Sequence, residues 1–102
     1  MPERFYDLYA NNGTAPTNIP LAKHKTAPKG MPLVAYALPP WPLSVNATED
    51  MPIPNSDAAL GRWGYYSAVS FTDSNIGMCL DVLEELSLTN STIAVVAGDH
   101  GW

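Results

Sequence analysis

The fold is decided by residues 65–102, which read YYSAVSFTDSNIGMCLDVLEELSLTNSTIAVVAGDHGW. In the first part of this stretch, apolar side chains recur at steps of three or four residues, or at their sum, at Tyr66, Val69, Ile76, Leu80 and Leu83. This spacing places them on one face of a helix. Because helix N-cap residue types follow Pro54 directly, the pattern predicts an amphipathic helix over 55–87.

A second element follows a short polar turn. Residues 92–97 read TIAVVA, a continuous and largely β-branched run that ends at Gly98. Such a run is typical of a strand covered on both faces, as in a parallel α/β sheet. One strand cannot form a sheet, so we predict an α/β fold of which this chain is a fragment, with a buried strand at 92–97.

Residues 1–54 have a different character. All ten prolines lie between Pro2 and Pro54, and each one removes a backbone donor and restricts the residue before it. The segment is nevertheless rich in aromatic and aliphatic side chains, which favours contact with another surface rather than disorder. We therefore predict a proline-rich extended arm over 1–54.

Charge and hydropathy exclude several classes of protein. The chain has 102 residues and a net charge of −5, all of it carried by residues 55–102. A nucleic-acid binder or a polybasic membrane-surface protein needs a cationic face, so neither partner is expected. No apolar run approaches the ~20 residues of a membrane span, and no apolar segment typical of a secretion signal follows Met1.

Candidate chemistry lies directly after the predicted strand. Asp99 and His100 stand between Gly98 and Gly101, and ligands of open α/β sheets bind beyond the carboxyl ends of the strands. A carboxylate beside an imidazole serves either as a pair of metal ligands or as an acid–base pair. On spacing alone, a hydrogen-bonded turn explains the same residues equally well.

These residues resemble the sulfatase family, and within it the iduronate-2-sulfatase type. The resemblance rests on residues 65–73, on Ile76-Gly77, on residues 80–83 and 90–93, and on Asp-His-Gly-Trp at 99–102. The arm is similar as well, at residues 2–9, 19–22 and 30–36. Asp-His-Gly by itself is less specific, because related phosphodiesterases of the alkaline-phosphatase superfamily also use it.

The resemblance implies a calcium-dependent hydrolysis of sulfate esters, with a sulfated small molecule or, in the iduronate-2-sulfatase type, a sulfated saccharide as the substrate. It implies Asp99 and His100 as the metal pair. A hard carboxylate suits Ca²⁺, whereas imidazole suits softer metals. His100 therefore either ligates the metal or donates a hydrogen bond to the sulfate or to the nucleophile. Trp102 either lines the sugar pocket or has a packing role.

The family's nucleophile is a formylglycine made from cysteine in a Cys-x-Pro-x-Arg setting, which Cys79 lacks. The formylglycine is therefore expected in the remainder of the sulfatase domain, and this chain alone is predicted to be inactive. Two alternatives stay open: a phosphodiesterase or phosphonate hydrolase of the same superfamily, and a non-catalytic secreted glycoprotein derived from a sulfatase.

The remaining polar residues have mostly structural interpretations. Asn12, Asn46 and Asn90 each begin an N-glycosylation acceptor pattern, which favours a lysosomal or secreted parent. Asp73 is expected to be a hydrogen-bonded structural aspartate, and Cys79 a buried small side chain. His24, between Lys23 and Lys25, is expected in a solvated loop, with binding of an anionic polysaccharide as the alternative.

Overall fold

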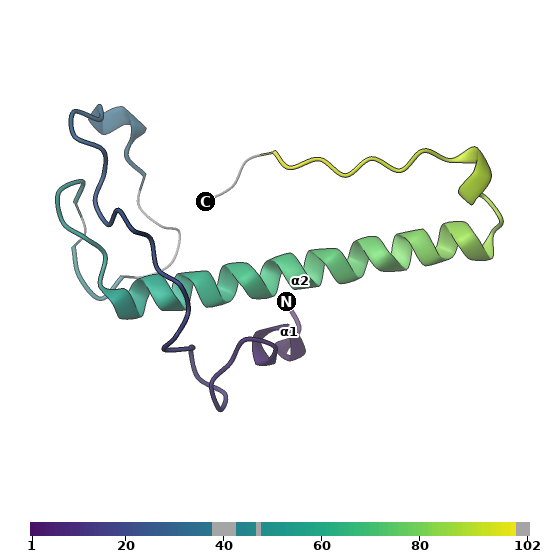
Figure 1. Cartoon of the computed structure of the whole chain (residues 1–102), viewed down its shortest axis with the longest axis horizontal. Helices are drawn as coiled ribbons and strands as arrows, with labels where there is room; N and C mark the ends of the chain where they lie inside the picture. The colour runs from purple at the N-terminus through teal and green to yellow at the C-terminus, as the bar shows by residue number, and fades with distance from the viewer. Residues whose placement is uncertain (38–42, 47, 100–102) are drawn as a thin grey trace. The chain divides into compact units, whose positions relative to one another are not determined.

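The computed structural model describes residues 1–37, 43–46 and 48–99. Its helical elements are α1 (Glu3–Asp7), the 3-10 turn η1 (Leu33–Ala35), the long helix α2 (Asn55–Glu85) and the 3-10 turn η2 (Thr89–Ser91) (Figure 1). The chain divides into two units, Met1–Phe71 and Thr72–Trp102, with the boundary inside α2.

Helix α2 occupies most of the range predicted to be helical. It begins at Asn55, directly after Pro54, and carries Asp57 in its first turn, where a negative charge interacts favourably with the helix dipole. At the other end, Ser87 adopts a left-handed conformation with φ of 57°. The Leu88 amide then donates to the Leu83 carbonyl at 2.8 Å, and the Ser87 amide donates to that of Glu84 at 2.9 Å. This pair of bonds is a Schellman motif, and it ends the helix two residues before the predicted limit.

The core of the first unit is a set of aromatic contacts between α1 and α2. Phe5 meets Phe71 edge-on with ring centroids 5.3 Å apart, and Tyr6 meets Trp63 at the same distance. Tyr9, just after α1, lies 5.7 Å from Tyr66. Offset and edge-on pairs are the favoured geometries of aromatic rings, so these contacts hold α1 on α2.

The helix face that makes this core differs from the predicted stripe. Its residues are Trp63, Tyr66, Ser67, Ser70 and Phe71, which follow one another at helical spacing. Ser67 is fully buried and donates its hydroxyl to the Trp63 carbonyl at 2.7 Å. Of the predicted stripe, Tyr66 belongs to the core, but Val69 is 52% exposed and Leu80 46% exposed. Small and aromatic residues, rather than aliphatic ones, define the packed face.

Two features of the arm depart from a simple extended segment. Residues 3–7 form α1, which was not predicted and which begins directly after Pro2 with Glu3 in its first turn. Proline is well tolerated just before a helix, because its missing N–H would have no helical partner there. The rest of the arm, where the structure describes it, is irregular apart from η1 and a tight turn at 11–14 with Gly13 at φ of 75°.

The arm is also tied to α2 by polar contacts. The Arg62 guanidinium donates to the Pro20 carbonyl at 2.7 Å, and the Trp63 indole N–H donates to the Tyr6 carbonyl at 2.8 Å. The Asp57 carboxylate, itself buried, accepts hydrogen bonds from the Ser44 amide at 2.7 Å and hydroxyl at 2.8 Å. Buried polar groups need such partners, and these contacts fix the course of the arm along the first half of α2.

The buried strand expected at 92–97 is not confirmed. Within the described ranges, the structure forms no strand, and its only bridge joins Asn11 to Thr14. Residues 92–97 follow η2 without regular secondary structure, and Ile93, Val95 and Val96 are 90%, 82% and 72% exposed. The physical reason is that a strand needs a neighbour to accept its backbone hydrogen bonds and to cover its side chains.

The second unit buries little of its own surface. None of its described residues, 72–99, is buried. Cys79 is exposed, so the expectation of a buried cysteine is wrong for this structure. Asp73 is exposed as well. This exposure does not fit the expected structural aspartate, whose carboxylate would be buried and hydrogen-bonded. No helix in the described part of the chain combines the length and the apolar character that a membrane span requires.

Candidate functional site

Asp99 is the last residue that the structure describes, and it is exposed. It follows Gly98, where an added Cβ would meet nothing within 4 Å. The backbone before Asp99 is therefore open to close approach by another group. His100 and Trp102, the other site residues predicted from the sequence, lie outside the described residues.

The described residues do not assemble a complete metal site. Within them, no group of three or more His, Cys, Asp and Glu side chains is placed to hold a metal ion. Asp99 has the right chemistry for Ca²⁺, because its carboxylate oxygens are hard ligands. A carboxylate offers at most two oxygens, however, and Ca²⁺ takes six to eight. A calcium site that includes Asp99 would need further ligands from outside the described residues.

The three predicted glycosylation sites share an exposed position. Asn12 lies in the tight turn at 11–14 with φ of 50°, Asn46 lies in the arm, and Asn90 lies in η2. Attachment of a bulky glycan requires a surface asparagine. Their exposure meets this requirement, and their modification stays a prediction.

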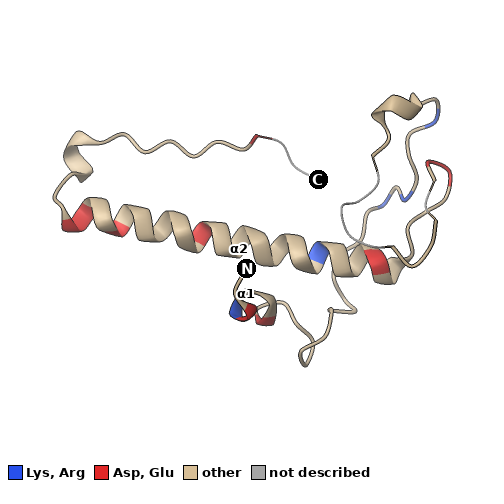
Figure 2. Ribbon diagram, turned by 180° about the vertical axis from the view of Figure 1, so that it is seen from behind, with Lys and Arg blue, Asp and Glu red and all other residues tan. Residues whose placement is uncertain are grey.

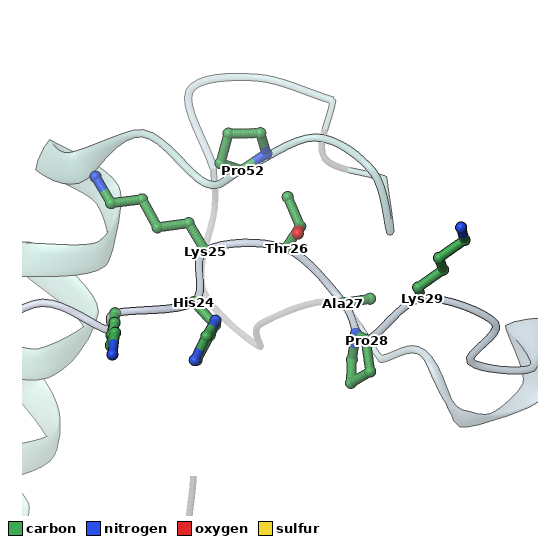
Figure 3. A pocket seen from close by; sticks show the side chains of 8 residues that line it. His24, Lys25, Thr26, Ala27, Pro28, Lys29 and Pro52 are labelled. Atoms are coloured by element: carbon green, nitrogen blue, oxygen red, sulfur yellow. The ribbon is translucent and has the colours of Figure 1, made fainter.

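The second candidate site is the loop at residues 23–29, which contains His24. The sequence predicted a solvated loop there, with binding of an anionic polysaccharide as the alternative. Residues 23–29 line an open hollow of about 680 Å³ together with Pro52. The close view shows Lys25, Thr26 and Lys29 on the side of the loop that faces Pro52, with His24 and Pro28 on the other side (Figure 3). The signal in the sequence was the Lys-His-Lys run at 23–25, with Lys29 four residues after Lys25. Pro52 is distant in the sequence, and only the fold brings it to the same hollow.

This hollow is held by backbone and side-chain contacts. The Lys25 ammonium donates to the Asn55 side-chain oxygen at 3.0 Å, which ties the loop to the start of α2. The Ala27 amide donates to the Glu49 carbonyl at 3.0 Å, and the Met31 amide donates to the Pro28 carbonyl at 3.1 Å. Gly30, at φ of 79°, completes the turn that follows. The lysine side chains are thus presented by a loop with defined anchors.

Comparison with known proteins finds sulfatases. The chain is 35% identical over 111 aligned positions to iduronate 2-sulfatase from Homo sapiens and 32% identical to that from Mus musculus, each match covering 99% of this chain and 19% of the relative. It is 29% identical to a sulfatase from Formosa agariphila, over 100% of this chain and 19% of that relative. No family model matches the chain. No solved structure matches it either.

The three relatives have similar names, and their matches cover similar shares of this chain. All are named as sulfatases, and the match to each covers nearly all of this chain. The chain spans about a fifth of the length of these curated relatives. The chain is therefore similar to one segment of sulfatases over nearly its whole length.

Proposed function

We propose that this chain is part of a calcium-dependent sulfatase that hydrolyses sulfate esters of sulfated saccharides. The observation that carries the proposal is the similarity to sulfatases over 99% of the chain. Two of these relatives are named iduronate 2-sulfatase, and because iduronate is a sugar acid, the name supports a saccharide as the substrate class. The longer protein would be lysosomal or secreted, which agrees with three exposed glycosylation patterns.

In this proposal, residues 92–97 form a parallel strand within an α/β sheet completed by the remainder of the sulfatase domain. The exposure of Ile93 and Val95 supports it, because nearly bare β-branched side chains gain free energy when a sheet covers them, at roughly 25 cal/mol per Å² of apolar surface. Asp99 and His100 would then stand at the carboxyl end of that strand, where ligands of such sheets bind.

Asp99 would supply carboxylate oxygens to a Ca²⁺ ion, and His100 would either add a ligand or donate a hydrogen bond to the sulfate. The bound metal ion would polarise the sulfate oxygens as a Lewis acid. The formylglycine nucleophile and the other calcium ligands would come from the remainder of the domain. Trp102 would line the sugar pocket or pack beside it.

Two other functions compete with this one. A phosphodiesterase or phosphonate hydrolase of the same superfamily would use the same residues on a phosphate. A non-catalytic secreted glycoprotein derived from a sulfatase would keep the fold and lack the nucleophile. The names of the relatives favour sulfate over phosphate, and an intact Cys-x-Pro-x-Arg in the longer polypeptide would separate an enzyme from the non-catalytic protein.

The first prediction concerns which ester is hydrolysed. We expect a polypeptide that spans the full length of the sulfatase relatives to release sulfate from an aryl sulfate much faster than phosphate from the matching aryl phosphodiester. The 102-residue chain alone should release neither, because its described residues contain neither a nucleophile in the formylglycine setting nor a full set of metal ligands. Faster phosphate release would overturn the sulfatase assignment in favour of the phosphodiesterase. Release of neither product by a polypeptide with the nucleophile would favour the non-catalytic protein.

A further inference from the structure

Positive charge is concentrated in one place in this acidic chain. The chain has five Lys and Arg residues against ten Asp and Glu. All three of its lysines, Lys23, Lys25 and Lys29, line the open hollow of the arm, together with His24. The described residues that line this hollow include no Asp or Glu. Figure 2 shows basic positions on the arm, with an acidic segment of the same arm close to them, while most other acidic positions lie along α2 and α1. That acidic segment includes Glu49, whose carbonyl accepts from the Ala27 amide at 3.0 Å.

The hollow presents donors for an anion. In Figure 3 the Lys25 side chain extends from the loop toward the start of α2, the Lys29 side chain lies at the opposite end of the loop, and Thr26 lies between them with its hydroxyl next to the backbone. An ammonium group has three donor hydrogens, so the Lys25 bond to Asn55 leaves two for a ligand. That bond also holds the ammonium group in place, which lowers the entropy lost when an anion binds.

We propose that this hollow binds the sulfate and carboxylate groups of a sulfated acidic saccharide, through Lys25, Thr26 and Lys29. The choice of saccharide rests on the proposed function, but the site uses none of the residues proposed for hydrolysis. A saccharide fits better than a nucleic acid, because the chain's net charge of −5 opposes a long polyphosphate, whereas a short ligand meets only the local cluster. The hollow would hold part of the saccharide at a site additional to the one where the ester is cleaved.

The test is binding of a heparin hexasaccharide to the 102-residue chain, measured by isothermal titration calorimetry without any turnover. We expect saturable binding that weakens as sodium chloride is raised, because counterions are released. Lys29→Gln should weaken binding about two- to fivefold, the effect of one exposed charge pair, and Lys25→Gln/Lys29→Gln about tenfold. Arg4→Gln removes the same charge from α1, outside the hollow, and should leave the affinity within twofold of the wild type.

Three results would overturn the proposal. These are equal losses in Lys29→Gln and Arg4→Gln, equal affinity for the fully desulfated hexasaccharide, and equal affinity for a single-stranded polynucleotide many times longer than the hexasaccharide. Circular dichroism of each variant checks that α2 is retained. Because binding is read apart from sulfate release, loss of this site would leave the sulfatase assignment standing. Binding of the hexasaccharide by the 102-residue chain, together with no sulfate release by a polypeptide that spans the full length of the sulfatase relatives and carries the nucleophile, would refute the assignment alone.

Discussion

Asp99→Ala is expected to lower sulfate-ester hydrolysis by about 100-fold or more in a polypeptide that spans the full length of the sulfatase relatives. The reason is that Asp99 follows directly on residues 92–98 and, in the proposed sheet, would stand at the ligand-binding end of a strand. Loss of one preorganised charged group that stabilises a transition state costs about 10²- to 10³-fold in rate. The measurement is kcat on an aryl sulfate at a fixed calcium concentration.

The matched control is Asp73→Ala, which removes the same charge from an exposed position in the middle of α2. We expect its kcat to stay within about twofold of the wild type, because most exposed substitutions have small effects. Thermal unfolding of both variants separates loss of function from loss of folded protein. Near-normal kcat in Asp99→Ala at ordinary calcium would refute its assignment as a metal ligand.

The second large effect is structural. Trp63→Ala should release α1 from α2, because Trp63 makes an edge-on contact with Tyr6 and donates its indole N–H to the Tyr6 carbonyl. An aromatic pair and a hydrogen bond each contribute about 0.5–1.5 kcal/mol, so the docked state should lose about 2 kcal/mol. The Tyr9 amide, which donates to the Tyr6 carbonyl at 3.1 Å, should then exchange its hydrogen about 30-fold faster.

Two further variants isolate the causes of this effect. Trp63→Phe keeps a ring and removes the N–H, so Tyr9 should exchange at an intermediate rate. Val69→Ala trims a side chain that is half exposed on the same helix, and it should leave the exchange of Tyr9 unchanged. Exchange of Tyr9 in Trp63→Ala at the wild-type rate would mean that the aromatic contacts do not hold α1 in place.

The long helix could be predicted because its signals are local. Apolar residues at helical spacing and N-cap residue types after Pro54 indicate α2 without any knowledge of the rest of the fold. Its packed face could not be predicted in the same way. The face is chosen by what lies against it, and α1 presents aromatic rings to Trp63 and Phe71 while Ser67 lets the two segments approach closely.

The candidate site, by contrast, could not be predicted from local sequence signals alone. Residues 92–97 have the composition of a strand, but a strand exists only with a neighbour, and the described part of the chain offers none. Asp99 was recognised by its sequence context and by resemblance, not by a constellation of ligands. The basic hollow could be recognised only from the folded structure. The Lys25 ammonium is held by a hydrogen bond to Asn55, and Pro52 lines the hollow from a distant part of the sequence. Neither feature has a signature in the sequence.

The role of calcium can be measured as release of inorganic sulfate from a sulfated saccharide by the longer polypeptide, before and after calcium is removed with a chelator. We expect sulfate release to fall at least tenfold after chelation and to return when Ca²⁺ is restored, because the electrostatic stabilisation of the sulfate oxygens is lost and regained. Sulfate release that continues unchanged without calcium would contradict the proposed role of Asp99 and, with it, the proposed mechanism.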